Sequence, residues 1–263
     1  MQKPFLLLYL MILSSLLYAQ NPLENGLVAY YPFNGNAQDA SGQKHGEVHG
    51  AEVQQGMRCG QDSYHFDGYT NYIDFGSHPG FNQFEKGLTV SLWVYIEPKY
   101  QVGLSLLAGR WAFNKDKDQF GLFLGSKNTL VFSVGDGHTL EEGVFGKSML
   151  QNETWYHLVG VWRPNGDMAI FINGELNNTG RQTGRGINNK SEVSFKVGRQ
   201  VEGVDRPFKG YLDEVKVYNR SLSTNEVKML FDRDYDGCKQ VLVQGNVKDK
   251  NTGEMLTAEV LVE

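Results

Sequence analysis

The chain has 263 residues, of which 40% are hydrophobic and 12% aromatic, and a formal net charge of −5 at pH 7. This length allows one large β domain plus a further fragment, since sandwiches and barrels often reach about 200 to 250 residues as one unit. The mild acidity, without blocks of like charge, argues against nucleic acid or an anionic membrane surface as the main partner.

The N-terminal residues have the composition of a secretory signal peptide. The basic residue Lys3 precedes an apolar run from Phe5 to Leu13, and the small residue Ala19 suits signal peptidase. The run is shorter than the roughly 20 apolar residues of a spanning helix, and polar residues follow directly. We therefore expect residues 1–19 to be cleaved rather than to anchor the chain. The mature protein would be secreted or held in the cell envelope, without a transmembrane segment.

The chain has two cysteines, Cys59 and Cys238. In an exported protein an even pair favours one disulfide over two free thiols. A bond between Cys59 and Cys238 would tie the end of the domain back to an early loop.

Short runs with period-2 alternation, bounded by Gly, Asn, Asp and Pro, follow one another along the chain. They predict strands at 27–33, 64–66, 72–75, 88–96, 104–108, 119–124, 129–134, 154–162, 169–172, 193–197 and 210–218. Many short strands without βαβ alternation indicate an all-β fold, a two-sheet antiparallel jelly-roll sandwich.

Three local patterns refine this picture. Residues 154–162 are apolar on both faces, which indicates a central strand, and His157 within it reads as a packed, hydrogen-bonded core histidine. Asn173-Gly174 is a pair preferred in tight hairpin turns. Ser223 and Glu226 form a capping box that opens one short C-terminal helix over 227–231.

The chain changes character after residue 237. Residues 238–263 begin a new alternating pattern and break at 251–253. We expect a linker and the first strands of a second, apparently incomplete β-sandwich; the alternative is a tail strand added to the first domain.

Five segments carry a family resemblance: 26–51, 64–76, 88–98, 153–176 and 208–231. In this order they resemble the concanavalin A-like, laminin G-like jelly-roll domains of secreted and cell-surface proteins. The resemblance covers about residues 26–231, and we assign 20–237 to this domain. The tail resembles, over a shorter segment, the start of a carboxypeptidase regulatory-like, transthyretin-type sandwich.

The loop after the first predicted strand is rich in oxygen ligands. Asn34, Asn36, Asp39 and Ser41 offer side-chain oxygens of the kind that calcium prefers. The resemblance implies a structural calcium held by Asp39 and Asp213, with Asn36 as a helper. The alternative is that these side chains form Asx turns and bind no metal.

Asp213 and Glu214 interrupt an apolar strand. Strict alternation would place one carboxylate on each face of the sheet. A carboxylate inside a sandwich needs calcium or a paired Arg or Lys.

The sequence lacks the signatures of catalysis that this fold could carry. Glycoside hydrolases need two carboxylates presented together, and their alternating acidic strand is absent. Sugar sites use aromatic rings, and the loop candidates are Tyr69, Tyr100, Trp111 and Phe145. Trp111, between two predicted strands, is the strongest of these as a ligand-binding residue, although a loop tryptophan can also cover a core edge.

These observations predict an exported, non-catalytic binding module stabilised by calcium. Its partner would be a glycan or a cell-surface protein. The alternatives are a structural or adhesive spacer of a cell-envelope protein and, less favoured, a glycoside hydrolase of the same fold.

Overall fold

The structure is a computed structural model. It describes residues 21–42, 44–98, 103–138, 142–184 and 186–236, together with the backbone of 242–248 and 255–261. The predicted signal peptide, Tyr100 and Cys238 lie outside these residues.

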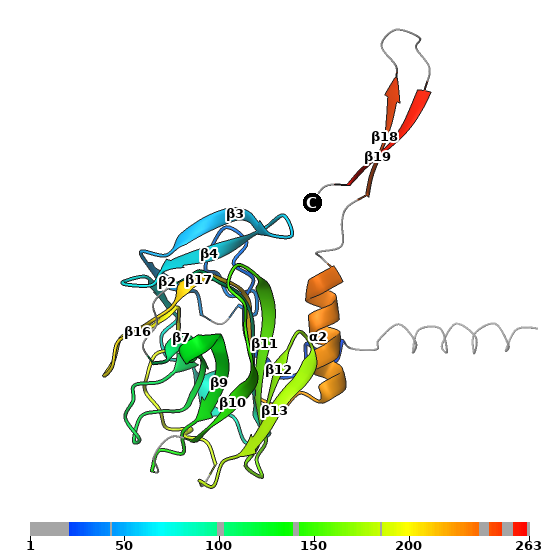
Figure 1. Cartoon of the computed structure of the whole chain (residues 1–263). Coiled ribbons are helices and arrows are strands. Elements are labelled where there is room, and N and C mark those ends of the chain that lie inside the picture. Colours follow the sequence, from blue (N-terminus) through cyan, green and yellow to red (C-terminus); the bar gives the residue numbers. More distant parts are fainter. Residues whose placement is uncertain are drawn as a thin grey trace, which may run out of the picture.

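Two large antiparallel sheets form a sandwich (Figure 1). The eight-stranded sheet runs in the order β13 (Glu175–Arg181), β12 (Asp167–Ile172), β11 (Trp155–Trp162), β6 (Leu88–Ile96), β17 (Lys209–Tyr218), β4 (Gln61–Asp67) and β3 (Glu52–Arg58), with β1 (Leu27–Tyr31) paired to β17. The seven-stranded sheet runs β10 (Glu142–Met149), β9 (Thr129–Val134), β8 (Phe120–Leu124), β7 (Ser105–Arg110), β14 (Lys196–Val197), β5 (Tyr72–Asp74) and β2 (Glu47–His49). The predicted all-β, two-sheet antiparallel jelly-roll class is confirmed.

Smaller elements complete the described chain. The strands β15 (Arg199–Gln200) and β16 (Arg206–Pro207) form a short hairpin, and two 3₁₀ turns lie at η1 (Pro79–Asn82) and η2 (Ser126–Asn128). The strands β18 (Leu242–Lys248) and β19 (Met255–Leu261) pair with each other in a two-stranded sheet of their own. That they open a second sandwich stays a prediction, as does the domain division at 237/238.

The core lies between the two large sheets. Alternate residues of facing strands, such as Leu92 and Leu158 from one sheet and Phe120 and Phe132 from the other, are fully buried in one cluster. The strand β11 lies between β12 and β6, so the predicted central strand is confirmed. His157 on β11 is 0% exposed, and its Nε2 lies 2.8 Å from Ser91 Oγ, as expected for a hydrogen-bonded core histidine.

One helix, α2 (Thr224–Asp236), covers the outer face of the eight-stranded sheet (Figure 1). Ser223 Oγ accepts from the Glu226 N–H at 3.3 Å, and Glu226 Oε2 accepts from the Ser223 N–H at 2.9 Å. The predicted capping box is therefore confirmed, although the helix runs beyond the predicted 227–231. Val227 and Leu230 pack in an apolar cluster that includes Phe171 of β12.

The turn between β12 and β13 is the predicted Asn173-Gly174 hairpin. Both residues have positive φ, 51° and 78°, as a type I′ turn requires. No helix in the described part of the chain is long and apolar enough to cross a membrane.

A buried arginine holds the loops at one end of the sandwich. Arg110, at the end of β7, is 0% exposed. Its guanidinium donates to the carbonyls of Phe81, Ser191 and Val193 at 2.6–3.0 Å, and to the side chains of Ser77, Asn82 and Gln119. Burial lowers the pKa of Arg110 to about 10. None of these partners is a carboxylate, so the geometry of the guanidinium fork, rather than an ion pair, joins these segments.

We predict that Arg110→Met lowers the free energy of unfolding by at least about 3 kcal/mol, because each buried carbonyl left unpaired costs about 1–3 kcal/mol. Arg110→Lys keeps the charge but offers fewer donors, and its loss should be intermediate. Denaturant unfolding of both variants measures the effect. Arg181→Met, at a side chain that is 65% exposed, is the control and should change stability by less than about 1 kcal/mol. Equal stability of all three variants would contradict this role of Arg110.

Candidate functional site

The predicted calcium ligand Asp39 is a buried acceptor that holds its own loop. Its side chain is 4% exposed and accepts from the backbone N–H groups of Tyr30, Ser41 and Lys44 at 2.8–3.1 Å, as well as from the Ser41 hydroxyl. The Asp39 N–H donates to His45 Nδ1. These contacts fix the oxygen-rich loop without requiring an ion.

Asn36 forms an Asx turn, in which its Oδ1 accepts from the Gln38 N–H at 2.9 Å. This is the alternative that the sequence left open for the loop. Among the described residues, no group of three or more His, Cys, Asp and Glu could hold a metal ion. Calcium at Asn36, Asp39 and Asp213 stays a prediction.

The third predicted ligand, Asp213, lies at a β-bulge in β17. The pairing with β6 shifts between Asp213↔Trp93 and Lys216↔Ser91, so three residues of β17 span two of β6, and Glu214 has φ 53°. Asp213 and Glu214 therefore share the outer face, while Val215 returns to the core. The expectation of one carboxylate on each face was wrong, because it assumed an unbroken alternation.

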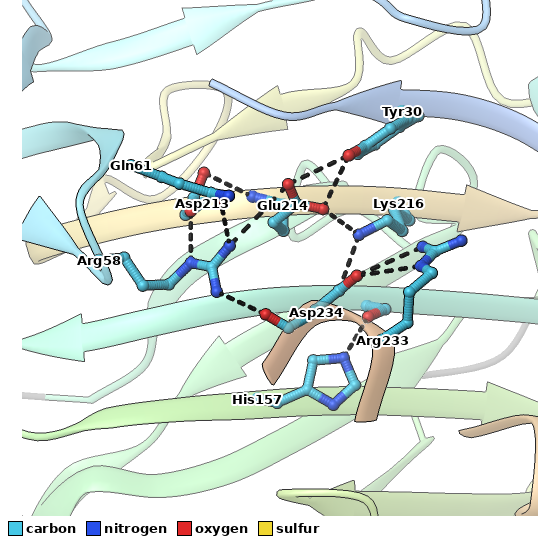
Figure 2. Close-up of polar contacts among 10 residues, drawn as sticks. Tyr30, Arg58, Gln61, His157, Asp213, Glu214, Lys216, Arg233 and Asp234 are labelled. Atoms are coloured by element: carbon cyan, nitrogen blue, oxygen red, sulfur yellow. Dashed lines mark hydrogen bonds and ion pairs between the residues drawn. The ribbon is translucent and has the colours of Figure 1, made fainter. Parts of the chain in front are cut away.

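Six charged side chains meet on this outer face, beneath the C-terminal part of α2 (Figure 2). We call them the charge cluster: Arg58, Asp213, Glu214, Lys216, Arg233 and Asp234. Three are basic and three are acidic residues, so their formal charges cancel. All except Arg233 are less than 10% exposed.

Each buried charge of the cluster has a specific partner. Arg58 Nε donates to Asp213 Oδ2 at 2.5 Å, and Arg58 Nη1 donates to the Asp234 carbonyl at 3.2 Å. Lys216 Nζ donates to Glu214 and, at 2.8 Å, to Asp234 Oδ2. The Tyr30 hydroxyl donates to Glu214 at 2.9 Å, which adds β1 to the cluster (Figure 2).

The electrostatic environment differs between the two aspartates. Burial raises the pKa of Asp213 to about 7, and the attraction of Arg58 offsets only part of that effect. Burial also disfavours the charged form of Asp234, but its neighbours, Lys216 foremost and Arg233 among them, together hold the pKa of Asp234 below its usual range. Burial lowers the pKa of His157 to about 3, so this histidine is neutral at pH 7. Apart from Arg233, the charge cluster is buried and internally paired, which suits a structural clasp rather than a substrate site.

Cys59 lies at the turn between β3 and β4, where its φ is 54°. The preceding residue, Arg58, donates to the carbonyl of Asp234, so the last turn of α2 lies beside this turn. Cys238 lies outside the described residues, and its pairing with Cys59 stays a prediction.

An aromatic pocket of about 210 Å³ lies on the outer face of the seven-stranded sheet. Its lining residues, which define it, are Leu104, Trp111, Phe113, Phe123, Val131, Ser133, Gly143 and Phe145. Phe123 and Val131 point to this face because their neighbours on β8 and β9 point into the core.

Trp111, the predicted ligand-binding residue, follows β7 directly and forms one wall of the aromatic pocket. It is 2% exposed and packs with Leu106, Phe123 and Val131 on the outer face of β7, β8 and β9. Its Nε1–H is buried without a hydrogen-bond partner in the described chain. Phe145 on β10 is 62% exposed at the same pocket. The sequence analysis missed Phe113 and Phe123, whose rings lie 6.1 Å apart.

We predict a strong energetic coupling between Arg58 and Asp213. Arg58→Met or Asp213→Asn alone should lower the free energy of unfolding by about 3–5 kcal/mol, because each leaves a buried charge without its partner. The double variant should lose clearly less than the sum. Denaturant unfolding of all four proteins gives the coupling energy. The exposed pair Arg181–Asp167, at 2.9 Å, is the matched control and should couple by less than about 1 kcal/mol. Additive losses at Arg58 and Asp213 would contradict the clasp.

Known proteins share this fold at low sequence identity. Domain 4 of AbnA, a GH43 extracellular arabinanase from Geobacillus stearothermophilus solved in complex with arabinotriose, aligns with a TM-score of 0.59 at 22% identity, covering 78% of this chain and 97% of that one. The binding domain of Paraclostridial Mosquitocidal Protein 1 aligns with a TM-score of 0.66 at 15% identity, covering 89% and 63%.

A curated relative and a family model match the sequence itself. The chain is 22% identical over 170 residues to the non-toxic nonhemagglutinin of Paraclostridium bifermentans, which covers 64% of this chain but only 14% of that protein. The laminin G-like family model described as the concanavalin A-like lectin/glucanases superfamily matches residues 67–228, more than half of the chain. The chain therefore belongs to the concanavalin A-like lectin/glucanases superfamily.

Proposed function

We propose that this protein is an exported, non-catalytic binding module that recognises carbohydrate at the aromatic pocket. The observation that carries the proposal is a set of aromatic rings around one small pocket, one of them exposed and another with an unpartnered donor. Phe145 is 62% exposed, and the buried Trp111 Nε1–H has no hydrogen-bond partner among the described residues.

The chemistry of the pocket suits a sugar. Pyranose rings have apolar C–H faces that pack on aromatic side chains, while their hydroxyls bind a few polar groups. Phe145 and Phe113 supply rings, and the Ser133 hydroxyl lines the same pocket. The volume of about 210 Å³ is below the range of about 300–1,000 Å³ for drug-sized ligands, which suits a single sugar unit.

The relatives support a binding role. One similar structure is a domain of an arabinanase in complex with arabinotriose, and another is the binding domain of a mosquitocidal protein. Both similarities are of fold only, so the ligand of this chain has to be inferred from the residues of its own pocket.

The position of the acidic residues supports a role without catalysis. A glycosidase presents two carboxylates to the substrate. The neighbouring carboxylates Asp213 and Glu214 are instead buried against Arg58 and Lys216 under α2. Export, the structural calcium and the disulfide belong to the same proposal.

We predict that Phe145→Ala weakens glycan binding about 5- to 10-fold, because the loss of one stacked ring removes about 0.5–1.5 kcal/mol beyond its buried area. A glycan array selects the probe, and calorimetry measures its affinity with calcium and with a chelator. Met149→Ala, on the same strand and 61% exposed but outside the pocket, is the matched control. Equal affinities of the two variants would show that the binding site lies outside the aromatic pocket. No binding to any glycan would refute the proposal. Identical affinity and melting temperature with calcium and with the chelator would refute the proposed structural calcium site.

We predict a disulfide between Cys59 and Cys238 in the exported protein. Mass spectrometry of a non-reduced digest should find the two cysteine peptides joined. The double variant Cys59→Ser, Cys238→Ser should unfold more easily, by about 2–4 kcal/mol. Free thiols at both positions in protein purified from the culture medium would contradict the bond.

A further inference from the structure

A second orphaned donor lies beside Phe113, one of the residues that line the aromatic pocket. The guanidinium of Arg206 on β16 stacks over the Phe113 ring, with Cζ 5.1 Å from the ring centroid. Its Nε is buried and has no hydrogen-bond partner within the described ranges. Native proteins seldom leave such donors unpaired, so this donor marks a position where water or a ligand can supply an acceptor.

The acidic residues of the same hairpin are engaged elsewhere. Arg199 Nε and Nη2 donate to both carboxylate oxygens of Asp205, at 2.8 and 2.9 Å. Glu202 pairs with Lys196. In the part of the chain that the structure describes, Arg206 forms no ion pair, and its charge is left for a partner from outside.

The location of Arg206 connects it to the pocket. Phe113, on which the guanidinium stacks, is a wall of the pocket, and its ring lies 6.3 Å from that of Trp111. A methyl group placed on Gly103, the residue before the lining residue Leu104, would lie 3.0 Å from Arg206 Nη1. The cation therefore lies next to the lining residue Phe113 and close to the backbone before Leu104, although Arg206 is not itself part of the lining.

We propose that the ligand of this pocket is an acidic sugar, a hexuronic acid unit whose carboxylate binds Arg206 while its ring packs on the aromatic side chains. This inference rests on the proposed function and specifies its ligand. The planar guanidinium matches a carboxylate with two parallel hydrogen bonds. The chain carries a net charge of −5, so binding an anion depends on a local cation such as this one.

The test compares two probes of equal length, an oligogalacturonate and the corresponding neutral galactose oligomer, by calorimetry at low salt. Wild-type protein should bind the acidic oligomer at least about ten-fold more tightly, as expected for a hydrogen-bonded charge pair of about 1.5–3 kcal/mol. Arg206→Gln should remove this preference and leave the affinity for the neutral oligomer within about two-fold. Added salt should reduce the preference.

Two controls make the result specific. Lys147→Gln removes an exposed cation from β10, the strand that carries Phe145, at a position outside the pocket lining, and should keep the preference. Unchanged thermal unfolding of Arg206→Gln shows that the hairpin is intact. Loss of the preference in both variants, or its retention in Arg206→Gln, would overturn the inference.

The failures of the two proposals are distinguishable. If Phe145→Ala weakens both oligomers and Arg206→Gln changes neither, carbohydrate recognition stands and the acidic ligand is refuted. If neither oligomer binds but a polyglutamate peptide does so through Arg206, the carbohydrate assignment itself is refuted.

Discussion

One extra residue in β17 determines how α2 is held on the outer face of the eight-stranded sheet. The bulge at Asp213 and Glu214 turns two successive carboxylates to the same face, where Arg58 and Lys216 neutralise them. Asp234 brings α2 into the cluster and Tyr30 brings β1, so elements from both ends of the domain meet there. Buried ion pairs contribute little net stability compared with apolar packing, yet an unmatched member is costly. The cluster therefore acts mainly by selecting one position of the helix on the sheet.

The strands that could be predicted are those with a buried face. The prediction matched β6 and β9 to the residue and came within a few residues for β8 and β11. The strands β2, β3, β10 and β13 are among those that were missed, as are the short strands β15 and β16. The strands β2, β3, β10 and β13 lie at sheet edges, and sequences such as ELNNTGR in β13 are mostly polar and exposed, although Val144 of β10 still packs in the core. Alternation carries no hydrophobic signal in such strands, and only backbone pairing with a neighbour defines them.

The candidate sites show the same limit. The composition of the loop at Asn36 and Asp39 indicated many oxygen ligands, but it could not show that backbone N–H groups already use the Asp39 carboxylate. The partner of Asp213 is 155 residues away, at the end of a strand without a sequence signal. Likewise, Trp111 and Phe145 could be picked out from the sequence as aromatic candidates. The contact between Phe113 and Arg206 could not, because it forms only when the β15–β16 hairpin folds against Phe113.

The pairing of β1 with β17 has a consequence for how such a module can be used. Leu27 lies opposite Tyr218, and Arg220 donates to the carbonyls of Pro22 and Asn25. The first and last strands of the sandwich thus begin and end at neighbouring points, and α2 continues the chain from there. A unit with this connectivity can be spliced into a surface loop of a larger host with little change in the host's path. The proposed binding pocket lies on the seven-stranded sheet, whereas β1 and β17 belong to the eight-stranded sheet. Joining the module to a host through β1 and β17 would therefore leave the pocket exposed.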